Sequence, residues 1–202
     1  MKLKVFISLF SLLAITSGAH AAGDAAAGKN KAAVCFSCHG PNGNSMNPVW
    51  PKLAGQHADY IAKQLTDFKT GKTRKDPLML GQVAALSEKD MADLGAFFAK
   101  QKISAGGADE TLVKEGEKIF RAGNKATGVS ACMACHGPTG SGNPAAKFPS
   151  LQGQHAAYTE KALRDFKTGV RSNDAGKMMR NVTAMMTERE IKAVSSYIQG
   201  LH

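Results

Sequence analysis

Two short motifs hold the residues best suited to chemistry. Each reads Cys-x-x-Cys-His, the spacing at which c-type haem is attached to a protein. In this chemistry the two thiols add to the haem vinyl groups, and the following histidine binds one face of the iron. The motifs use all four cysteines of the chain, so they predict two covalently attached haem c groups and leave no thiol for a disulfide. The residues are Cys35, Cys38 and His39, and Cys132, Cys135 and His136.

A redox or zinc-binding Cys-x-x-Cys that happens to precede a histidine is the alternative for a single motif. Two copies in similar surroundings disfavour it, because structural zinc sites normally need other spacings.

The N-terminus has the three parts of an export signal. Lys2 and Lys4 are basic, residues 5–15 are apolar, and Ala19-His20-Ala21 is a small-residue cleavage site. Eleven apolar residues are too few to span a bilayer. We therefore expect residues 1–21 to be a signal peptide, cleaved near Ala21, and the mature chain to be periplasmic. An uncleaved anchor is the alternative. Export agrees with haem attachment, which bacteria carry out outside the cytoplasm.

The charge of the chain excludes one class of partner. The full sequence has 26 basic and 16 acidic residues, a formal net charge of +10. Its charges are interspersed, and no basic run is interleaved with aromatic residues, so we expect no nucleic acid partner. The surplus suits a basic face that docks an acidic redox partner, or simply keeps the chain in solution.

The two halves of the chain repeat one another, which decides its domain organisation. The haem motifs lie 97 residues apart. The segment 51–57 matches 149–155 at an offset of 98, and 86–98 matches 186–198 at an offset of 100. We expect tandem domains over residues 22–104 and 105–202, joined at the small-residue segment 104–108.

Each repeat shows helical patterning, and no stretch alternates as a strand would. In the first half, Asp24 can cap a helix that leads to Cys35, and residues 57–68 have apolar side chains at helical spacing before Gly71. A third helix begins at Ser87 with a capping box, and Thr187 starts its counterpart. The fold class is therefore all-α.

A sixth ligand to each iron must come from elsewhere in the repeat. An electron carrier needs both axial positions filled, and methionine raises the potential relative to a second histidine. Met79 and Met179 each lie seven residues before the match at Leu86 and Met186, in the loop before the last helix. Met178 is an adjacent competitor without a counterpart, because Leu78 occupies that position.

Two further features leave alternatives open. His57 and His155 also repeat and would make both haems bis-histidine, although their place next to Gly-Gln at a helix start suggests a position beside the solvent. The carbonyl groups of Pro51 and Pro149 are suited to accept the second ring N–H of the proximal histidines. The competing interpretation of these prolines is a simple turn.

These motifs together resemble the cytochrome c4 family of bacterial dihaem electron carriers, over essentially the whole chain after residue 21. The resemblance implies two cytochrome c-like domains related by a pseudo-twofold axis. It implies that His39 with Met79, and His136 with Met179, bind the two irons. It also implies electron transfer toward a membrane terminal oxidase. One departure is a longer loop in the second domain, over residues 123–130.

We expect an electron carrier and not an enzyme, with no small-molecule substrate. Its partners would be redox proteins, a membrane electron donor and a terminal oxidase, and peripheral contact with the membrane is compatible with this role. A dihaem peroxidase or sulfur-compound dehydrogenase would need an open ligand position and groups poised for proton transfer. A cytochrome subunit docked to a separate catalytic subunit, such as a flavoprotein, remains a third hypothesis.

Overall fold

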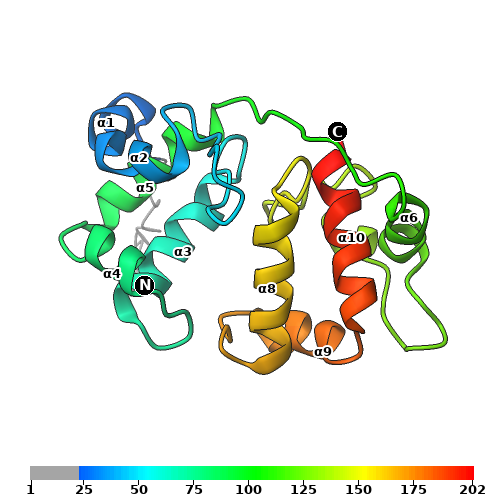
Figure 1. Ribbon diagram of the computed structural model, residues 1–202. Coiled ribbons are helices and arrows are strands. Elements are labelled where there is room, and N and C mark those ends of the chain that lie inside the picture. Colours follow the sequence, from blue (N-terminus) through cyan, green and yellow to red (C-terminus); the bar gives the residue numbers. More distant parts are fainter. Residues whose placement is uncertain (1–22) are drawn as a thin grey trace, which may run out of the picture.

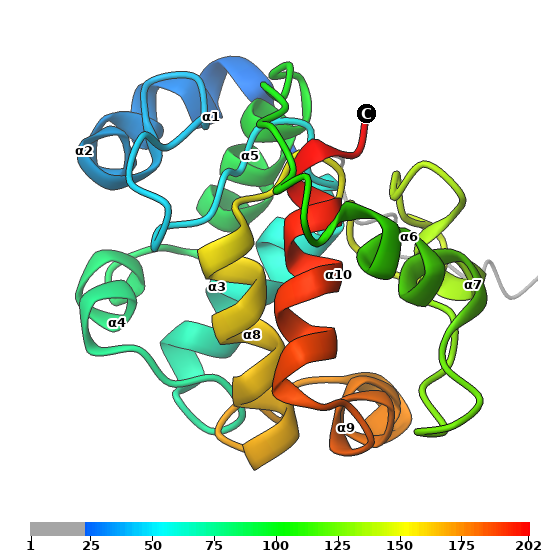
Figure 2. The ribbon, with the colours of Figure 1, turned by 45° about the vertical axis from the view of Figure 1, so that its right-hand side comes forward.

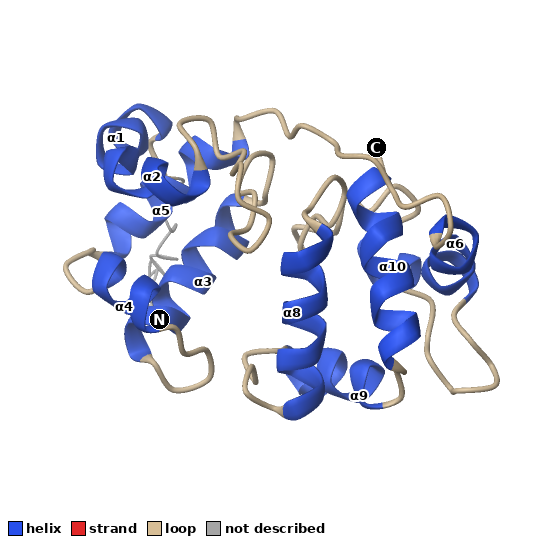
Figure 3. Ribbon diagram, in the orientation of Figure 1, coloured by secondary structure: helices blue, strands red, loops and turns tan. Residues whose placement is uncertain are grey.

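The computed structural model describes residues 23–202, and the predicted signal peptide lies outside that range. All regular elements in this range are helices (Figure 3). The only β pairings there are two isolated bridges, Asn124 with Val129 and Asn143 with Phe148. None of the helices described is long and apolar enough to cross a membrane. The all-α prediction is confirmed.

The N-terminal lobe contains residues 23–100 and is built around α5 (Glu88–Ala99). Both α1 (Ala25–Lys31) and α3 (Ala58–Thr70) pack against this helix. The haem motif lies on η1 (Ala32–Cys35) and α2 (Phe36–His39), and α4 (Pro77–Val83) follows α3. The buried core is made by Ala32, Ile61, Leu94, Phe97 and Phe98.

The C-terminal lobe repeats this arrangement around α10 (Glu188–Gly200). Its neighbours are α6 (Val113–Ala122) and α8 (Ala156–Thr168). The second motif is on α7 (Met133–His136), and η2 (Ala175–Lys177) and α9 (Met178–Ala184) follow α8. The core is larger here and comprises Ile119, Phe120, Val129, Met186, Ile191, Ala193, Val194, Tyr197, Ile198 and Leu201.

The helix ends are set by the residues that the sequence indicates. Asp24 caps α1 through its side chain. Ser87 and Thr187 each form a complete capping box. Gly71 ends α3 with a φ of +62°, a conformation that glycine adopts without strain. The capping boxes and the glycine stops recur in both lobes, whereas the side-chain cap of α1 has no counterpart at α6.

A glycine lets the first helix of each lobe cross the last one closely. A Cβ on Gly28 would lie 2.0 Å from the carbonyl oxygen of Asp93, and one on Gly116 would lie 2.1 Å from that of Ala193. Any larger residue would push the helices apart. This crossing holds the start of each motif against the core.

The segment between the second and third helices of each repeat is not the plain loop that the sequence suggests. It contains the short helices α4 and α9, which carry Met79 and Met179. Asp76 caps α4 and Pro77 occupies its first turn, a position that suits proline. A helix of seven residues is too short to show a clear periodic pattern in the sequence. Its stability comes mainly from packing and not from local propensity, so the sequence does not predict it.

The two lobes lie side by side, and the connecting chain runs along one edge (Figure 1). The helices α3 and α8 lie on the sides of the lobes that face each other. A second view shows α2 above α4 along one side of the N-terminal lobe (Figure 2). Hydrogen bonds across the gap between lobes join residues about one hundred positions apart in the chain.

Candidate functional site

The proximal histidines have the same surroundings in both lobes. Each is the last residue of a short helix and is only 7 % exposed. The Nδ1 atom of His39 lies 2.8 Å from the carbonyl oxygen of Pro51, and that of His136 lies 2.9 Å from the carbonyl oxygen of Pro149. Since a carbonyl only accepts, Nδ1 carries the proton in both rings. The prediction that these prolines orient the histidines is confirmed.

Burial keeps these two imidazoles neutral. It lowers the pKa of His39 and of His136, and this effect outweighs the opposing hydrogen bond to the proline carbonyl. A neutral ring that donates from Nδ1 keeps a lone pair on Nε2. Both histidines are therefore ready to bind a metal through Nε2.

The cysteines lie on the same short helical segments as the histidines. Cys35 and Cys38 are three residues apart, as are Cys132 and Cys135, so each pair shares one helical face. Burial is the main reason that the pKa of Cys35 is raised, and it raises the pKa of Cys132 to about 11. None of the four cysteines takes part in a disulfide.

The methionines are distinguished by exposure. Met79 and Met179 are half-buried, whereas their neighbours Leu78 and Met178 are 71 % and 41 % exposed. Leu80, one residue after Met79, is also 44 % exposed. The difference in burial favours Met179 over Met178.

The rival histidines lie at the interface between the lobes. His155 places Nε2 2.9 Å from the carbonyl oxygen of Ser45 and 3.0 Å from its hydroxyl group. The Nε2 atom of His57 is buried and has no hydrogen-bond partner within residues 23–202. Both residues are half-buried, so each remains partly beside the solvent as expected, while the opposite lobe supplies the partner of His155.

The donor set fits haem in both lobes. Each lobe has two cysteines and a neutral buried imidazole, and a separate short helix carries a half-buried thioether. Within residues 23–202, no cluster of three or more His, Cys, Asp or Glu side chains could hold a metal ion directly. The two buried imidazoles, each with a lone pair on Nε2, suit an iron that a porphyrin holds.

Two glutamines at equivalent positions join the lobes. The side chain of Gln154 accepts from the N–H of Lys52 at 2.9 Å and donates to its carbonyl oxygen at 2.9 Å. The side chain of Gln56 does the same with Ser150, at 3.0 and 2.9 Å. These reciprocal contacts have the pseudo-twofold relation that the repeat suggests. The sequence shows the repeated glutamines but not their partners.

The side chain of Lys52 makes contacts that have no counterpart in the other lobe, because Ser150 occupies the equivalent position. It is 7 % exposed, and its amine donates to the carbonyl oxygens of Ser104, at 2.5 Å, and Gly153, at 3.1 Å. Burial lowers the pKa of this amine. Lys52 thus ties the connecting chain to both lobes.

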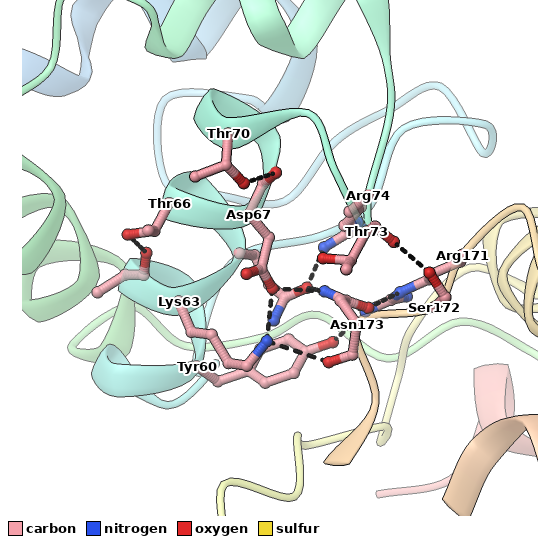
Figure 4. Close-up of polar contacts among 12 residues, drawn as sticks. Tyr60, Lys63, Thr66, Asp67, Thr70, Thr73, Arg74, Arg171, Ser172 and Asn173 are labelled. Carbon is pink, nitrogen blue, oxygen red and sulfur yellow. Dashed lines mark hydrogen bonds and ion pairs between the residues drawn. The ribbon is translucent and has the colours of Figure 1, made fainter. Parts of the chain in front are cut away.

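A second group of contacts crosses the interface between α3 and α8 (Figure 4). Arg74 stacks over Phe68, with 4.2 Å to the ring centroid, and donates to the hydroxyl group of Tyr158 at 2.9 Å. Arg171 donates to the hydroxyl group of Tyr60 at 2.8 Å in the opposite direction. Burial would raise the pKa of Tyr158, but the charges of the two arginines lower it.

Gln64 is where these contacts converge. Its side-chain oxygen accepts from Arg74 at 2.5 Å, from Arg171 at 3.0 Å and from Asn173 at 2.8 Å. The equivalent position in the second repeat is Ala162. The interface therefore combines the reciprocal contacts of Gln56 and Gln154 with polar contacts that only one repeat can make, those of Lys52 and Gln64. No periodic pattern in the sequence predicts these unpaired contacts.

Comparisons with known proteins agree with this geometry. The cytochrome c family model matches residues 25–102 and 113–202. A cytochrome c4 of Stutzerimonas stutzeri is 52 % identical, over 98 % of this chain and 99 % of that protein. The crystal structure of reduced recombinant cytochrome c4 from Pseudomonas stutzeri superposes with a TM-score of 0.86 at 51 % identity, covering 90 % of this chain and 100 % of that one.

A more distant relative carries another name. The thiosulfate dehydrogenase electron acceptor of Stutzerimonas stutzeri (strain A1501) is 35 % identical over 86 % of this chain and 82 % of that protein.

The near-complete match to the cytochromes c4 establishes two tandem cytochrome c domains, two covalently attached haem c groups and a role in electron transfer, not catalysis. The chain thus belongs to the cytochrome c4 family.

Proposed function

We propose that this protein is a periplasmic dihaem carrier that takes single electrons from a membrane donor and passes them toward a terminal oxidase. Cys35 and Cys38, with Cys132 and Cys135, attach the two haems. His39 and Met79 bind one iron, and His136 and Met179 bind the other. The observation that carries the proposal is the same buried histidine, hydrogen-bonded to a proline carbonyl, in both lobes.

Each haem supplies a one-electron store, and the residues around it set how readily it is reduced. The proline carbonyls fix the orientation of the imidazoles and raise their basicity. The thioethers of Met79 and Met179, which are neutral and soft, favour the reduced iron. The histidine and methionine of each lobe would together hold its haem iron and would leave no coordination site for a substrate.

The domain boundaries and the location form part of the proposal. Residues 1–21 are removed on export, cleavage falling near Ala21, and the domains comprise residues 22–104 and 105–202. The export signal in the sequence supports a periplasmic location. The basic surplus supports docking on acidic redox partners, and it is compatible with peripheral contact with an anionic membrane.

The test is the mass and redox titration of the purified holoprotein. Its mass should exceed that of the mature chain by two haem groups, which stay bound on denaturation. The oxidised spectrum should be low-spin with methionine ligation of both irons. A single added haem, or a high-spin iron, would contradict the proposal. A mass that includes residues 1–21 in periplasmic material would contradict the cleavage.

A sulfur-compound dehydrogenase is a second candidate for the donor. The relative named as a thiosulfate dehydrogenase electron acceptor supports it. The two candidates are separated by mixing the oxidised protein, in turn, with a reduced membrane donor and with a thiosulfate dehydrogenase plus thiosulfate. The faster rate of haem reduction in stopped-flow absorbance identifies the donor class. A dehydrogenase that copurifies with the protein would favour the second.

A further inference from the structure

The contact between the lobes reaches the peptide group that orients the proximal histidine. The carbonyl oxygen of Pro51 accepts from His39, and the N–H of the same peptide group is that of Lys52. This N–H donates to the side chain of Gln154 in the other lobe, at 2.9 Å. One peptide group therefore has the histidine of its own lobe on its oxygen and the glutamine of the opposite lobe on its nitrogen.

The second lobe repeats this arrangement in the opposite direction. The carbonyl oxygen of Pro149 accepts from His136 at 2.9 Å, and the N–H of the same peptide group, that of Ser150, donates to Gln56 at 3.0 Å. Gln154 is 8 % exposed, and Gln56 is half-buried. Each bonds the facing backbone at two points, so its orientation is fixed.

Hydrogen bonds in a chain strengthen one another. A peptide group whose N–H donates is polarised, so its oxygen becomes a better acceptor, by roughly 10–30 % per bond. A better acceptor draws the Nδ1 proton further from the imidazole and makes the ring a more basic ligand. A more basic ligand stabilises oxidised iron more than reduced iron, which lowers the reduction potential.

We infer that Gln56 and Gln154 are positioning residues that act across the interface, each tuning the haem of the opposite lobe through the peptide group that holds its proximal histidine. The inference rests on the proposed function, in which His39 and His136 bind the irons. It makes the two redox centres depend on the docking of the lobes, and not on their own domains alone.

The consequence is a crossed effect. Gln154→Leu removes the acceptor of the Lys52 N–H, which belongs to the same peptide group as the Pro51 carbonyl. The reduction potential of the N-terminal haem should therefore rise, while that of the C-terminal haem stays within error. Gln56→Leu should raise the potential of the C-terminal haem alone. A role confined to packing would instead disturb the variant's own domain, or both haems together.

The experiment is a spectroelectrochemical titration of the full-length holoprotein. The two haems are told apart in a Met79→His background, which lowers the N-terminal potential and separates the two waves. Proton NMR of the reduced protein supplies a second readout, because the Nδ1 proton of the opposite histidine should shift upfield when its hydrogen bond weakens. Gln101→Leu is the matched control, since within residues 23–202 the only hydrogen bond of that side-chain amide is to the carbonyl oxygen of Phe97 in its own lobe.

The crossed pattern in both readouts would support the inference. It is overturned by shifts in the variant's own lobe, by equal shifts of both haems, or by none. If Gln154→Leu yields no holoprotein, Gln154→Ser removes the same amide with less steric change, and the same outcomes apply. A wild-type protein with one haem, or without methionine ligation, would refute the proposed function instead; a normal wild type without the crossed pattern refutes only the inference.

Discussion

The surroundings of each histidine decide which of its ring nitrogens is free. His39 and His136 donate from Nδ1 to a proline carbonyl, which leaves Nε2 to a metal. His155 uses Nε2 in hydrogen bonds to Ser45. Histidine is thus a candidate iron ligand at positions 39 and 136 and an interface contact at position 155, because the hydrogen bond that each ring makes decides which nitrogen is left free.

The methionine ligands can be tested one residue at a time. Met79→Ala and Met179→Ala should each remove about half of the weak near-infrared band that Fe–S(Met) charge transfer gives in the oxidised protein, because each removes one of two thioether ligands. Leu78→Ala and Met178→Ala are the matched controls and should leave the band intact. Loss of the band in Met178→Ala would move the second ligand by one residue. An intact band in both ligand variants would favour His57 and His155.

The extra loop of the second domain is the element that differs most between the repeats. The segment 123–130 is closed by a hydrogen bond of 2.8 Å from the N–H of Asn124 to the carbonyl of Val129. The side chains of Asn124 and Thr127 both donate to the carboxylate of Glu190, at 2.7 Å. Glu190 also completes the capping box of α10 and is 3 % exposed. The loop is therefore anchored to the core of its domain through Val129 and Glu190.

Replacing this carboxylate should produce a pH-dependent loss of stability. Burial would raise the pKa of Glu190, but the hydrogen bonds from Thr187, Thr127 and Asn124 outweigh it and lower that pKa. The stabilisation is then complete above the ordinary Glu pKa of about 4.3 and is lost as the pH falls through the lower folded value. Glu190→Gln should reduce the free energy of unfolding by about 1–3 kcal/mol at neutral pH and by much less at strongly acidic pH.

Denaturant unfolding at the two pH values provides the measurement. Glu117→Gln is the control, because Glu117 is exposed, lies on α6 and, within the described part of the chain, pairs only with Arg121. It should change the free energy of unfolding by less than about 1 kcal/mol. An equal loss for Glu190→Gln at both pH values would show that the shape of the side chain, and not its charge, holds the loop.

At the scale of the whole molecule, polar contacts hold the lobes in one arrangement. Arg171 is 7 % exposed and reaches Tyr60 and Gln64 of the N-terminal lobe. Arg74 reaches Tyr158 in return. Buried polar groups of this kind are costly when a partner is removed, so they favour one docking geometry over others.

Arg171→Ala should uncouple the two lobes. It leaves the hydroxyl group of Tyr60 and the amide of Gln64 with fewer partners, a cost of about 1–3 kcal/mol. Calorimetry of the holoprotein should change from one cooperative transition to two. Arg189→Ala, which removes an exposed pair within the C-terminal lobe, should keep a single transition. A lower melting temperature without separation would mean that Arg171 stabilises its own lobe only.

The two haems should have different potentials, because the lobes differ in charge. Residues 22–100 have 10 basic and 7 acidic residues, and residues 101–202 have 14 and 9. Positive charge destabilises oxidised iron, so the charge difference places the C-terminal haem at the higher potential. A redox titration of Met79→His identifies the N-terminal haem by its large downward shift. If the C-terminal haem proves to be the lower one, the charge argument fails, while the role as an electron carrier stands.

The sequence by itself determined the features that depend on neighbours along the chain. The Cys-x-x-Cys-His motifs place two cysteines and a histidine close together, because these residues lie within five consecutive positions of the chain. The caps at Asp24, Ser87 and Thr187 act within three residues, so they could be predicted without a fold. The repeat predicted two all-α domains, and it pointed to Pro51 and Pro149 as partners of the proximal histidines.

Only the tertiary structure decided which polar residues are buried between the lobes. Gln64, Gln154 and His155 look like surface residues in the sequence, yet each contacts a residue about one hundred positions away. Such contacts depend on how two finished domains dock, and helical periodicity contains no information about docking. For the same reason the short helices that carry Met79 and Met179 were not predicted: packing against the rest of the lobe, and not local propensity, stabilises a helix of seven residues.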